Sequence, residues 1–193
     1  ARIMLNTHYP LVAIQTPWAD KFRKIQGDFI SRPVFTGSLL YAKKGDNFID
    51  RETIRKIMFE ENGEKIILLH AATPFGWNSI HPWVQLTLDE YIQQINDLIK
   101  VVEKVEGLYL ALKVRLKPAY GLTLEELSRL FLQSDCYNIY TEGSFEDYLL
   151  ASDLLVSFSS TTIEEALQNK IPVLQYDPFN RYCHIPAQKL IKD

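Results

Sequence analysis

From residue 65 onward, short apolar runs alternate with amphipathic segments along the chain. The runs have almost no polar alternation, as is typical of parallel strands buried on both faces. The segments between them place apolar residues three and four positions apart, which predicts helices with one buried face. We expect strands at residues 65–70, 108–114, 137–141, 153–158 and 171–177 and helices at residues 87–106, 123–132, 144–151 and 161–169. The pattern predicts an α/β fold, with a Rossmann-like, doubly wound parallel sheet over residues 61–193.

The pattern over residues 1–60 is less regular. We expect in order a short strand, a helix, an extended segment and a second helix, at residues 11–16, 17–25, 31–40 and 51–61. We interpret residues 1–60 as a lead-in to the Rossmann-like domain or as the tail of a preceding N-terminal domain. The chain starts at Ala1 and stops in a short helical pattern, so we expect it to be a fragment of a longer protein.

The composition is that of a globular protein, with 47% hydrophobic and 23% charged residues among 193. The net charge of −3 argues against a nucleic-acid partner, because such proteins usually carry a basic surface. No apolar run approaches the roughly 18 residues of a membrane span, so we expect at most peripheral membrane association. Two cysteines without metal-type spacing and the lack of an apolar leader indicate the cytoplasm, including the inner face of the membrane.

Polar residues gather where the predicted strands end, and ligands of open parallel sheets bind at the carboxyl ends of the strands. The candidates that follow the first four strands of the domain are His70 and Thr73; Lys113 and Arg115; Tyr140 and Thr141; and Ser159, Ser160, Thr161 and Thr162. Lys113 and Arg115 lie on the same side of their strand and suit a phosphate, although ordinary surface charges have the same pattern.

The four hydroxyl residues stand where a strand turns into a helix. Free backbone N–H groups and the helix dipole favour an anion at such a turn, and the hydroxyls add donors. An ordinary helix cap fits the same residues, with Thr161 and Glu164 as a capping box, and local chemistry alone favours that interpretation. Glu165 lies away from the packed face of the helix. It can accept two hydrogen bonds from a ribose diol, or it can be a solvated surface residue.

Residues 153–178, DLLVSFSSTTIEEALQNKIPVLQYDP, resemble the nucleotide-sugar-binding segment of GT-B glycosyltransferases, a pattern shared with non-hydrolysing nucleotide-sugar 2-epimerases. The resemblance implies that Glu165 binds the ribose and that the hydroxyl turn from Ser159 to Thr161 binds the diphosphate. Residues 110–115 look like a strand end of bacterial surface-polysaccharide transferases, and the edge at Tyr140 and Thr141 would contact the base. Nothing in the chain resembles a complete N-terminal acceptor domain.

Three functions remain open. The first is the donor half of a glycosyltransferase of polysaccharide or capsule biosynthesis, which binds a nucleoside diphosphate sugar and transfers it to a saccharide or lipid-linked acceptor held by a missing N-terminal domain. The second is half of a nucleotide-sugar epimerase, and the third is a non-catalytic Rossmann-like binding module. We expect no metal, because there is no Asp-x-Asp and no ligand cluster. We expect no cofactor, because Walker and G-x-G-x-x-G motifs are missing.

Overall fold

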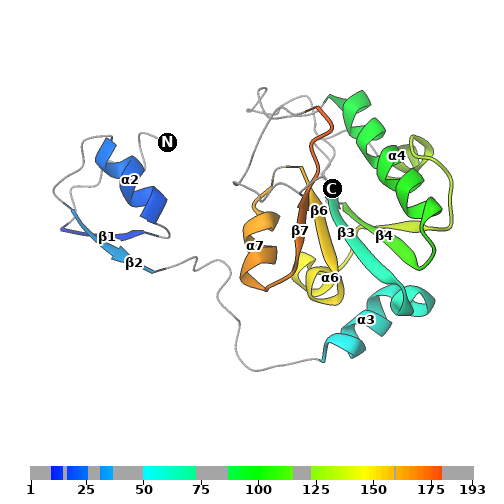
Figure 1. The fold of residues 1–193 in the computed structure, drawn as a ribbon, viewed down its shortest axis with the longest axis horizontal. Helices are drawn as coiled ribbons and strands as arrows, with labels where there is room; N and C mark the ends of the chain where they lie inside the picture. Colours follow the sequence, from blue (N-terminus) through cyan, green and yellow to red (C-terminus); the bar gives the residue numbers. More distant parts are fainter. Residues whose placement is uncertain are drawn as a thin grey trace, which may run out of the picture. The chain divides into compact units, whose positions relative to one another are not determined.

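The computed structural model describes residues 10–14, 17–25, 31–36, 50–72, 87–114, 123–158 and 160–179. The chain divides into two compact units, residues 1–47 and residues 48–193. In the first unit, the described elements are β1 (Leu11–Ile14), α2 (Pro17–Ile25) and β2 (Arg32–Phe35), and the two strands pair in parallel. Figure 1 shows the elements of both units.

The second unit is built on a five-stranded parallel sheet with the order β5-β4-β3-β6-β7. Its strands are β3 (Ile66–Ala72), β4 (Leu108–Val114), β5 (Tyr137–Tyr140), β6 (Leu154–Ser157) and β7 (Val173–Gln175). The first strand of this unit, β3, lies at the centre, with the next two on one side and the last two on the other. This is the Rossmann strand order, in which the direction of winding reverses beside the first strand. The predicted α/β fold and Rossmann-like sheet are therefore confirmed.

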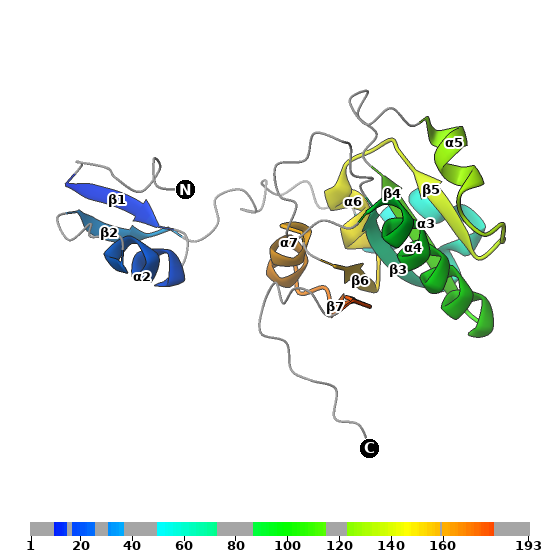
Figure 2. The same cartoon turned by 90° about the horizontal axis from the view of Figure 1, so that it is seen from above.

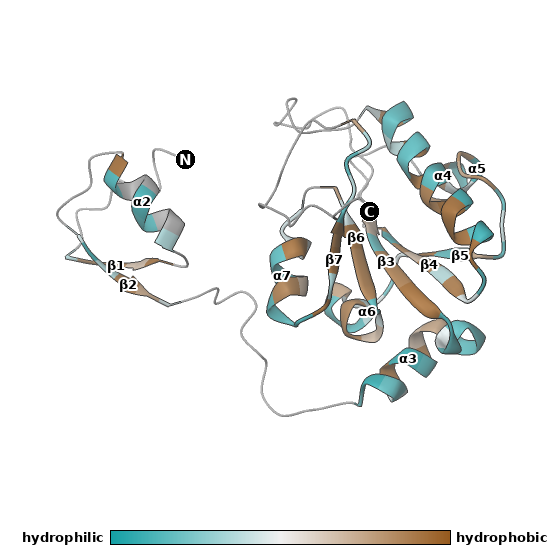
Figure 3. Cartoon of the chain, viewed as in Figure 1, coloured by the Kyte–Doolittle hydropathy of each residue, from teal (hydrophilic) through white to brown (hydrophobic). Residues whose placement is uncertain are grey.

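One face of the sheet is covered by α4 (Leu88–Lys104) and α5 (Leu124–Arg129). Tyr91, Ile95 and Ile99 of α4 pack against Leu110 and Leu112 of β4. Thr87 and Glu90 form a capping box at the start of α4, and Thr123 and Glu126 form another at the start of α5. The amphipathic patterns predicted at residues 87–106 and 123–132 thus form helices on this face, and Figure 3 shows the mixed colouring of α4 beside the apolar strands.

The opposite face is covered by α3 (Arg51–Phe59), α6 (Phe145–Ala151) and α7 (Thr162–Gln168). Ile54 and Phe59 of α3 join residues of α6 and α7 in a second core against β3, β4 and β6. The helices α4 and α3 therefore pack on opposite faces of the sheet, and Figure 2 shows the same elements from above. The sheet is therefore doubly wound, as the sequence predicts.

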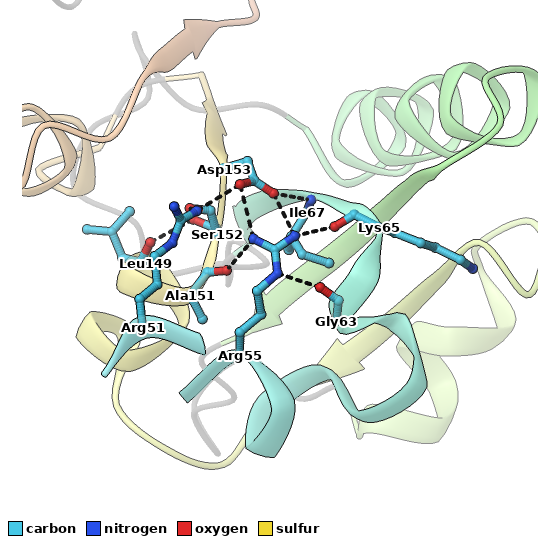
Figure 4. Close-up of polar contacts among 9 residues, drawn as sticks. All are labelled: Arg51, Arg55, Gly63, Lys65, Ile67, Leu149, Ala151, Ser152 and Asp153. Carbon is cyan, nitrogen blue, oxygen red and sulfur yellow. Dashed lines mark hydrogen bonds and ion pairs between the residues drawn. The ribbon is translucent and has the colours of Figure 1, made fainter. Parts of the chain in front are cut away.

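The α3 helix belongs to the second unit, and a partly buried ion pair between Arg55 and Asp153 attaches it to the sheet. All five N–H groups of the Arg55 guanidinium are used: they bond to the carbonyls of Gly63, Lys65 and Ala151 and to both carboxylate oxygens of Asp153 (Figure 4). The Asp153 carboxylate also accepts from the backbone N–H of Ile67, at 2.8 Å. The second unit therefore begins at Phe48, earlier than the residue 61 that the sequence indicated.

Candidate functional site

A cleft of about 530 Å³ opens at the carboxyl ends of the strands. Its described lining comes from β3, β4, the turn between β5 and α6, and the start of α7. The lining residues are Ala71, Lys113, Val114, Thr141, Gly143, Phe145, Ser160, Thr161, Thr162 and Glu165. Six of the residues selected from the sequence therefore lie around one cavity, although they come from three separate segments of the chain: Lys113, Thr141, Ser160, Thr161, Thr162 and Glu165.

The pleat of the strands decides which side chains reach this cleft. Along a strand, successive side chains point to opposite faces. Leu110 and Leu112 pack on the α4 face, whereas Tyr109 and Ala111 pack on the face of α6 and α7. The same alternation brings Lys113 to the α6 and α7 face, where the cleft lies.

The ammonium group of Lys113 is held by two contacts from neighbouring elements. Its Nζ atom donates a hydrogen bond to the carbonyl oxygen of Glu142, at 2.5 Å, and lies 4.9 Å from the centre of the Tyr148 ring. Burial lowers the pKa of Lys113 below its ordinary value, and the negative charge of Glu142 partly offsets this effect. The result is a partly desolvated cation at the wall of the cleft.

Glu165 is a half-buried carboxylate on the first turns of α7. Ile163 and Ala166 of the same helix are buried against the sheet, and this packing orients Glu165 toward the cleft. Within the described part of the chain, no hydrogen bond or ion pair involves its carboxylate. Burial raises the pKa of Glu165, and the like charge of Glu146 on α6 raises it further.

The hydroxyl turn does not form the capping box considered from the sequence. Thr161 occupies the N-cap position of α7 but makes no side-chain cap hydrogen bond. Instead, the Ser160 hydroxyl accepts a hydrogen bond from the backbone N–H of Thr162, at 3.3 Å. The Thr162 hydroxyl oxygen is buried and has no hydrogen-bond partner in the described structure, so a polar group beside the cleft is left unsatisfied.

His70 lies on the other face of the sheet. On β3, Leu68 packs on the α4 side and Leu69 packs on the side of α6 and α7. Because side chains alternate along a strand, His70 lies on the α4 side with Leu68. Its ring is 4% exposed, and Nδ1 donates a hydrogen bond of 2.7 Å to the carbonyl oxygen of Val156 on β6. Burial lowers the pKa of His70 to about 4, although the hydrogen bond to Val156 opposes the shift. His70 is therefore a neutral residue that joins two central strands, and it is not among the described residues that line the cleft.

Tyr140 is not among the described residues that line the cleft, although it packs on the α6 and α7 face of the sheet. Its hydroxyl contacts that of Tyr109 at 3.0 Å, and its ring packs against those of Phe59 and Tyr148. Its neighbour Thr141 does line the cleft. Three other residues selected from the sequence, Thr73, Arg115 and Ser159, lie outside the described residues.

Comparisons with known proteins agree with this architecture. No family model and no curated protein matches the chain. Six chains of solved structures do match. One is a candidate UDP-N-acetylglucosamine 2-epimerase from Listeria monocytogenes, with a TM-score of 0.54 and 18% identity over 83% of this chain and 40% of that one. The second unit has a GT-B-type, Rossmann-like fold.

A second match is HepE from Anabaena, solved in complex with UDP and glucose. Its TM-score is 0.46 and its identity 16%, over 85% of this chain and 43% of HepE. The chain therefore spans less than half the length of either of these GT-B-type structures.

The residues that support Lys113 at this cleft could not be predicted from the sequence. Gly143 has a φ of +79°, a conformation that suits glycine, and a side chain there would meet the Tyr148 ring at 3.3 Å. The position of Gly143 after a strand could have indicated a tight turn, but Tyr148 reaches Lys113 only through the tertiary fold. Nothing local to α6 indicates that contact.

Two further observations concern metal and membrane. Among the described residues, no group of three or more histidine, cysteine, aspartate or glutamate side chains is placed to hold a metal ion. Of the helices described, none combines the length and the apolar character that crossing a membrane requires.

Proposed function

We propose that the second unit binds a nucleoside diphosphate sugar in the cleft at the carboxyl ends of its strands. The observation that carries the proposal is the convergence of Lys113, the hydroxyls of Ser160 and Thr162, and Glu165 on one cavity. A cation and hydroxyl donors suit a diphosphate, and a carboxylate acceptor suits a ribose diol. The volume of about 530 Å³ lies within the usual range for small-molecule sites.

Each polar group of the cleft would contact a different part of the ligand. In this proposal, Lys113 and the Thr162 hydroxyl contact the diphosphate, which would satisfy the buried Thr162 oxygen. Glu165 accepts hydrogen bonds from the ribose and thereby gains the partners that its carboxylate otherwise lacks. Thr141 and Gly143, at the end of β5, lie where the base or the sugar would approach.

We further propose that the bound sugar is transferred, so that the chain is the donor half of a glycosyltransferase of polysaccharide biosynthesis. The bond between the anomeric carbon and the diphosphate breaks, and a bond to a hydroxyl oxygen of a saccharide or lipid-linked acceptor forms as that hydroxyl releases its proton to solvent. Lys113 stabilises the charge that develops on the departing diphosphate. The likeness of fold to the Listeria protein supports the epimerase alternative equally, because both reactions begin with the same ligand.

Isothermal titration calorimetry of the full chain with UDP, CDP and GDP tests the binding proposal. We expect one of these ligands to bind with 1:1 stoichiometry, and binding of none of them contradicts the proposal. Product analysis then separates the two reactions. An epimerase converts UDP-N-acetylglucosamine to its C2 epimer without an acceptor, whereas a transferase releases UDP in an acceptor-dependent manner.

A further inference from the structure

The Lys113 ammonium lies over the ring of Tyr148, and that ring packs against several neighbouring residues. Tyr148 is 5% exposed and lies in the core between α6 and the sheet. Its ring packs at an angle against Phe59, with centroids 6.0 Å apart, and against Tyr140, with centroids 5.1 Å apart. Gly143 borders the same ring. The ring therefore has little freedom to move, and the Lys113 ammonium stands 4.9 Å from its centre.

The second support of Lys113 comes from the turn after β5. The Glu142 carbonyl accepts one of the three N–H groups of the ammonium. Lys113 also lines the cleft. A lysine side chain loses rotamer entropy when a ligand fixes it. Two contacts that hold the ammonium before the ligand arrives would reduce that loss.

We propose that Tyr148 is a positioning residue, which fixes the ammonium of Lys113 for an anionic ligand, the diphosphate of the proposed nucleotide sugar. This inference rests on the proposed function, and it adds a residue that does not line the cleft itself. The face of an aromatic ring attracts a cation, and the attraction grows where both groups are partly desolvated. The lowered pKa of Lys113, caused first by burial, is consistent with such desolvation.

The chain contains a matched control for this contact. Lys65 lies 5.6 Å from the centre of the Tyr109 ring, at the amino-terminal edge of the same sheet face. Tyr109 is 3% exposed and belongs to the same core as Tyr148. Removal of either ring therefore disturbs the same core and removes one lysine–aromatic contact, but only one of the two lysines lies at the cleft.

The test uses calorimetry to compare the affinity of the full chain for whichever of UDP, CDP and GDP binds with its affinity for the corresponding nucleoside, written here for UDP and uridine. We expect Tyr148→Leu to weaken UDP binding about threefold to tenfold and to leave uridine binding within about twofold. Tyr148→Phe keeps the ring face and should bind UDP like the wild type. Tyr109→Leu should also bind UDP like the wild type, even where thermal melts show a similar loss of stability.

A double-mutant cycle shows whether Tyr148 acts through Lys113. In a Lys113→Ala background, Tyr148→Leu should weaken UDP binding no further. If Tyr148→Leu proves too unstable, 3,4,5-trifluorophenylalanine at position 148, compared with Tyr148→Phe, preserves the shape and weakens the attraction for the cation. Equal affinities for UDP in that pair overturn the inference.

The outcomes distinguish this inference from the function on which it rests. If the wild type binds none of UDP, CDP and GDP, the proposed function fails and the role of Tyr148 fails with it. If the wild type binds UDP and Lys113→Ala weakens that binding, but loss of the Tyr148 ring does not, only the positioning role is overturned. The same holds if Tyr148→Leu weakens UDP and uridine equally, because a general disturbance of the cleft would then explain the loss.

Discussion

The polar and charged side chains at the two edges of the parallel sheet differ in how completely they are hydrogen-bonded. At the amino-terminal edge, Arg55 uses all its donors and Asp153 accepts from two arginines and a backbone N–H. At the carboxyl-terminal edge, the Glu165 carboxylate makes no hydrogen bond in the described structure, and the Thr162 hydroxyl is buried without a partner. The first edge is complete without a ligand, whereas the second has groups that a polar ligand would satisfy.

The pKa shifts of two carboxylates follow this contrast. Burial alone would raise the pKa of Asp153, but the hydrogen bonds from Arg55 and Ile67 hold it below its ordinary value. Burial raises the pKa of Glu165, and Glu146 adds to the effect instead of opposing it. A protein keeps an uncompensated carboxylate in a cleft at a cost in stability, which is typical of a functional position.

Removal of the Arg55 contacts at the amino-terminal edge should have the largest effect on stability. We expect Arg55→Met to lower the free energy of unfolding by about 3 kcal/mol. The substitution removes two of the hydrogen bonds to Asp153 and the Arg55 donors to three backbone carbonyls, at a side chain that is only 10% exposed. Urea denaturation measures this change. UDP affinity should stay within about twofold of the wild type, and a tenfold loss would show that the two edges are not independent.

The ion pair between Arg55 and Asp153 also predicts how the stability of the fold changes at acidic pH. Because the pKa of Asp153 is lower in the folded state, the pair stabilises the fold above the ordinary aspartate pKa of 3.8, and this contribution disappears as the pH falls below it. Asp153→Asn should therefore lower stability near neutral pH and make the remaining stability less sensitive to pH below 4. An unchanged acid limb in urea denaturation at several pH values would contradict this assignment.

At the carboxyl-terminal edge, the largest effect should be on affinity. We expect Glu165→Ala to weaken nucleotide binding by about 1.5–3 kcal/mol, or roughly tenfold to a hundredfold, because a charged acceptor for the ribose is lost. Glu164→Ala is the matched control, since Glu164 is exposed and does not line the cleft. Calorimetry on both variants decides the point, and equal affinities would remove Glu165 from the ribose site.

A smaller effect should appear in the stability of the unliganded protein. The pKa of Glu165 is raised above its ordinary value of 4.5 in the folded state, so ionisation of the carboxylate disfavours the fold. This penalty is absent below pH 4.5 and is complete once the pH has risen through the folded-state pKa. We expect Glu165→Gln to stabilise the protein by a few tenths of a kcal/mol at pH 7, a small value because the side chain is partly solvated. The gain should vanish below pH 4.5 in thermal melts, and a loss of stability at pH 7 would contradict the proposed strain.

The smallest effect is expected from metal removal. The proposed ligand contacts are a lysine, hydroxyls and a carboxylate, so nucleotide affinity should be the same in a chelator and in added Mg²⁺ or Mn²⁺. Calorimetric titrations under both conditions measure this, and binding that needs the added metal would show that the assigned contacts are incomplete.

The elements of the second unit were predictable because each depends on local pattern. The apolar runs at residues 65–70, 108–114 and 153–158 match β3, β4 and β6 within a few residues. The attachment of α3 was not predictable, since Arg55 and Asp153 are 98 residues apart in the chain. A local pattern therefore located the elements, but not the contacts that decide where the second unit begins.

The cleft shows the same division. Strand ends indicated Lys113 and Thr141, and the family resemblance indicated Glu165; all three line the cavity. The sequence treated His70 in the same way, although strand alternation turns it to the opposite face, where it bonds to Val156. The place of Tyr148 under Lys113 depends on the packing of α6, which no local pattern describes.

The most direct test is a map of the nucleotide contacts by NMR, using backbone amide resonances of the full chain during a titration with whichever of UDP, CDP and GDP binds. We expect the largest shifts at residues 141–143 and 160–165, with little change at the amino-terminal edge, at residues 63–65 and 151–153. No shift with any of UDP, CDP and GDP at concentrations up to several millimolar would contradict binding in this cleft. So would shifts confined to residues outside the cleft.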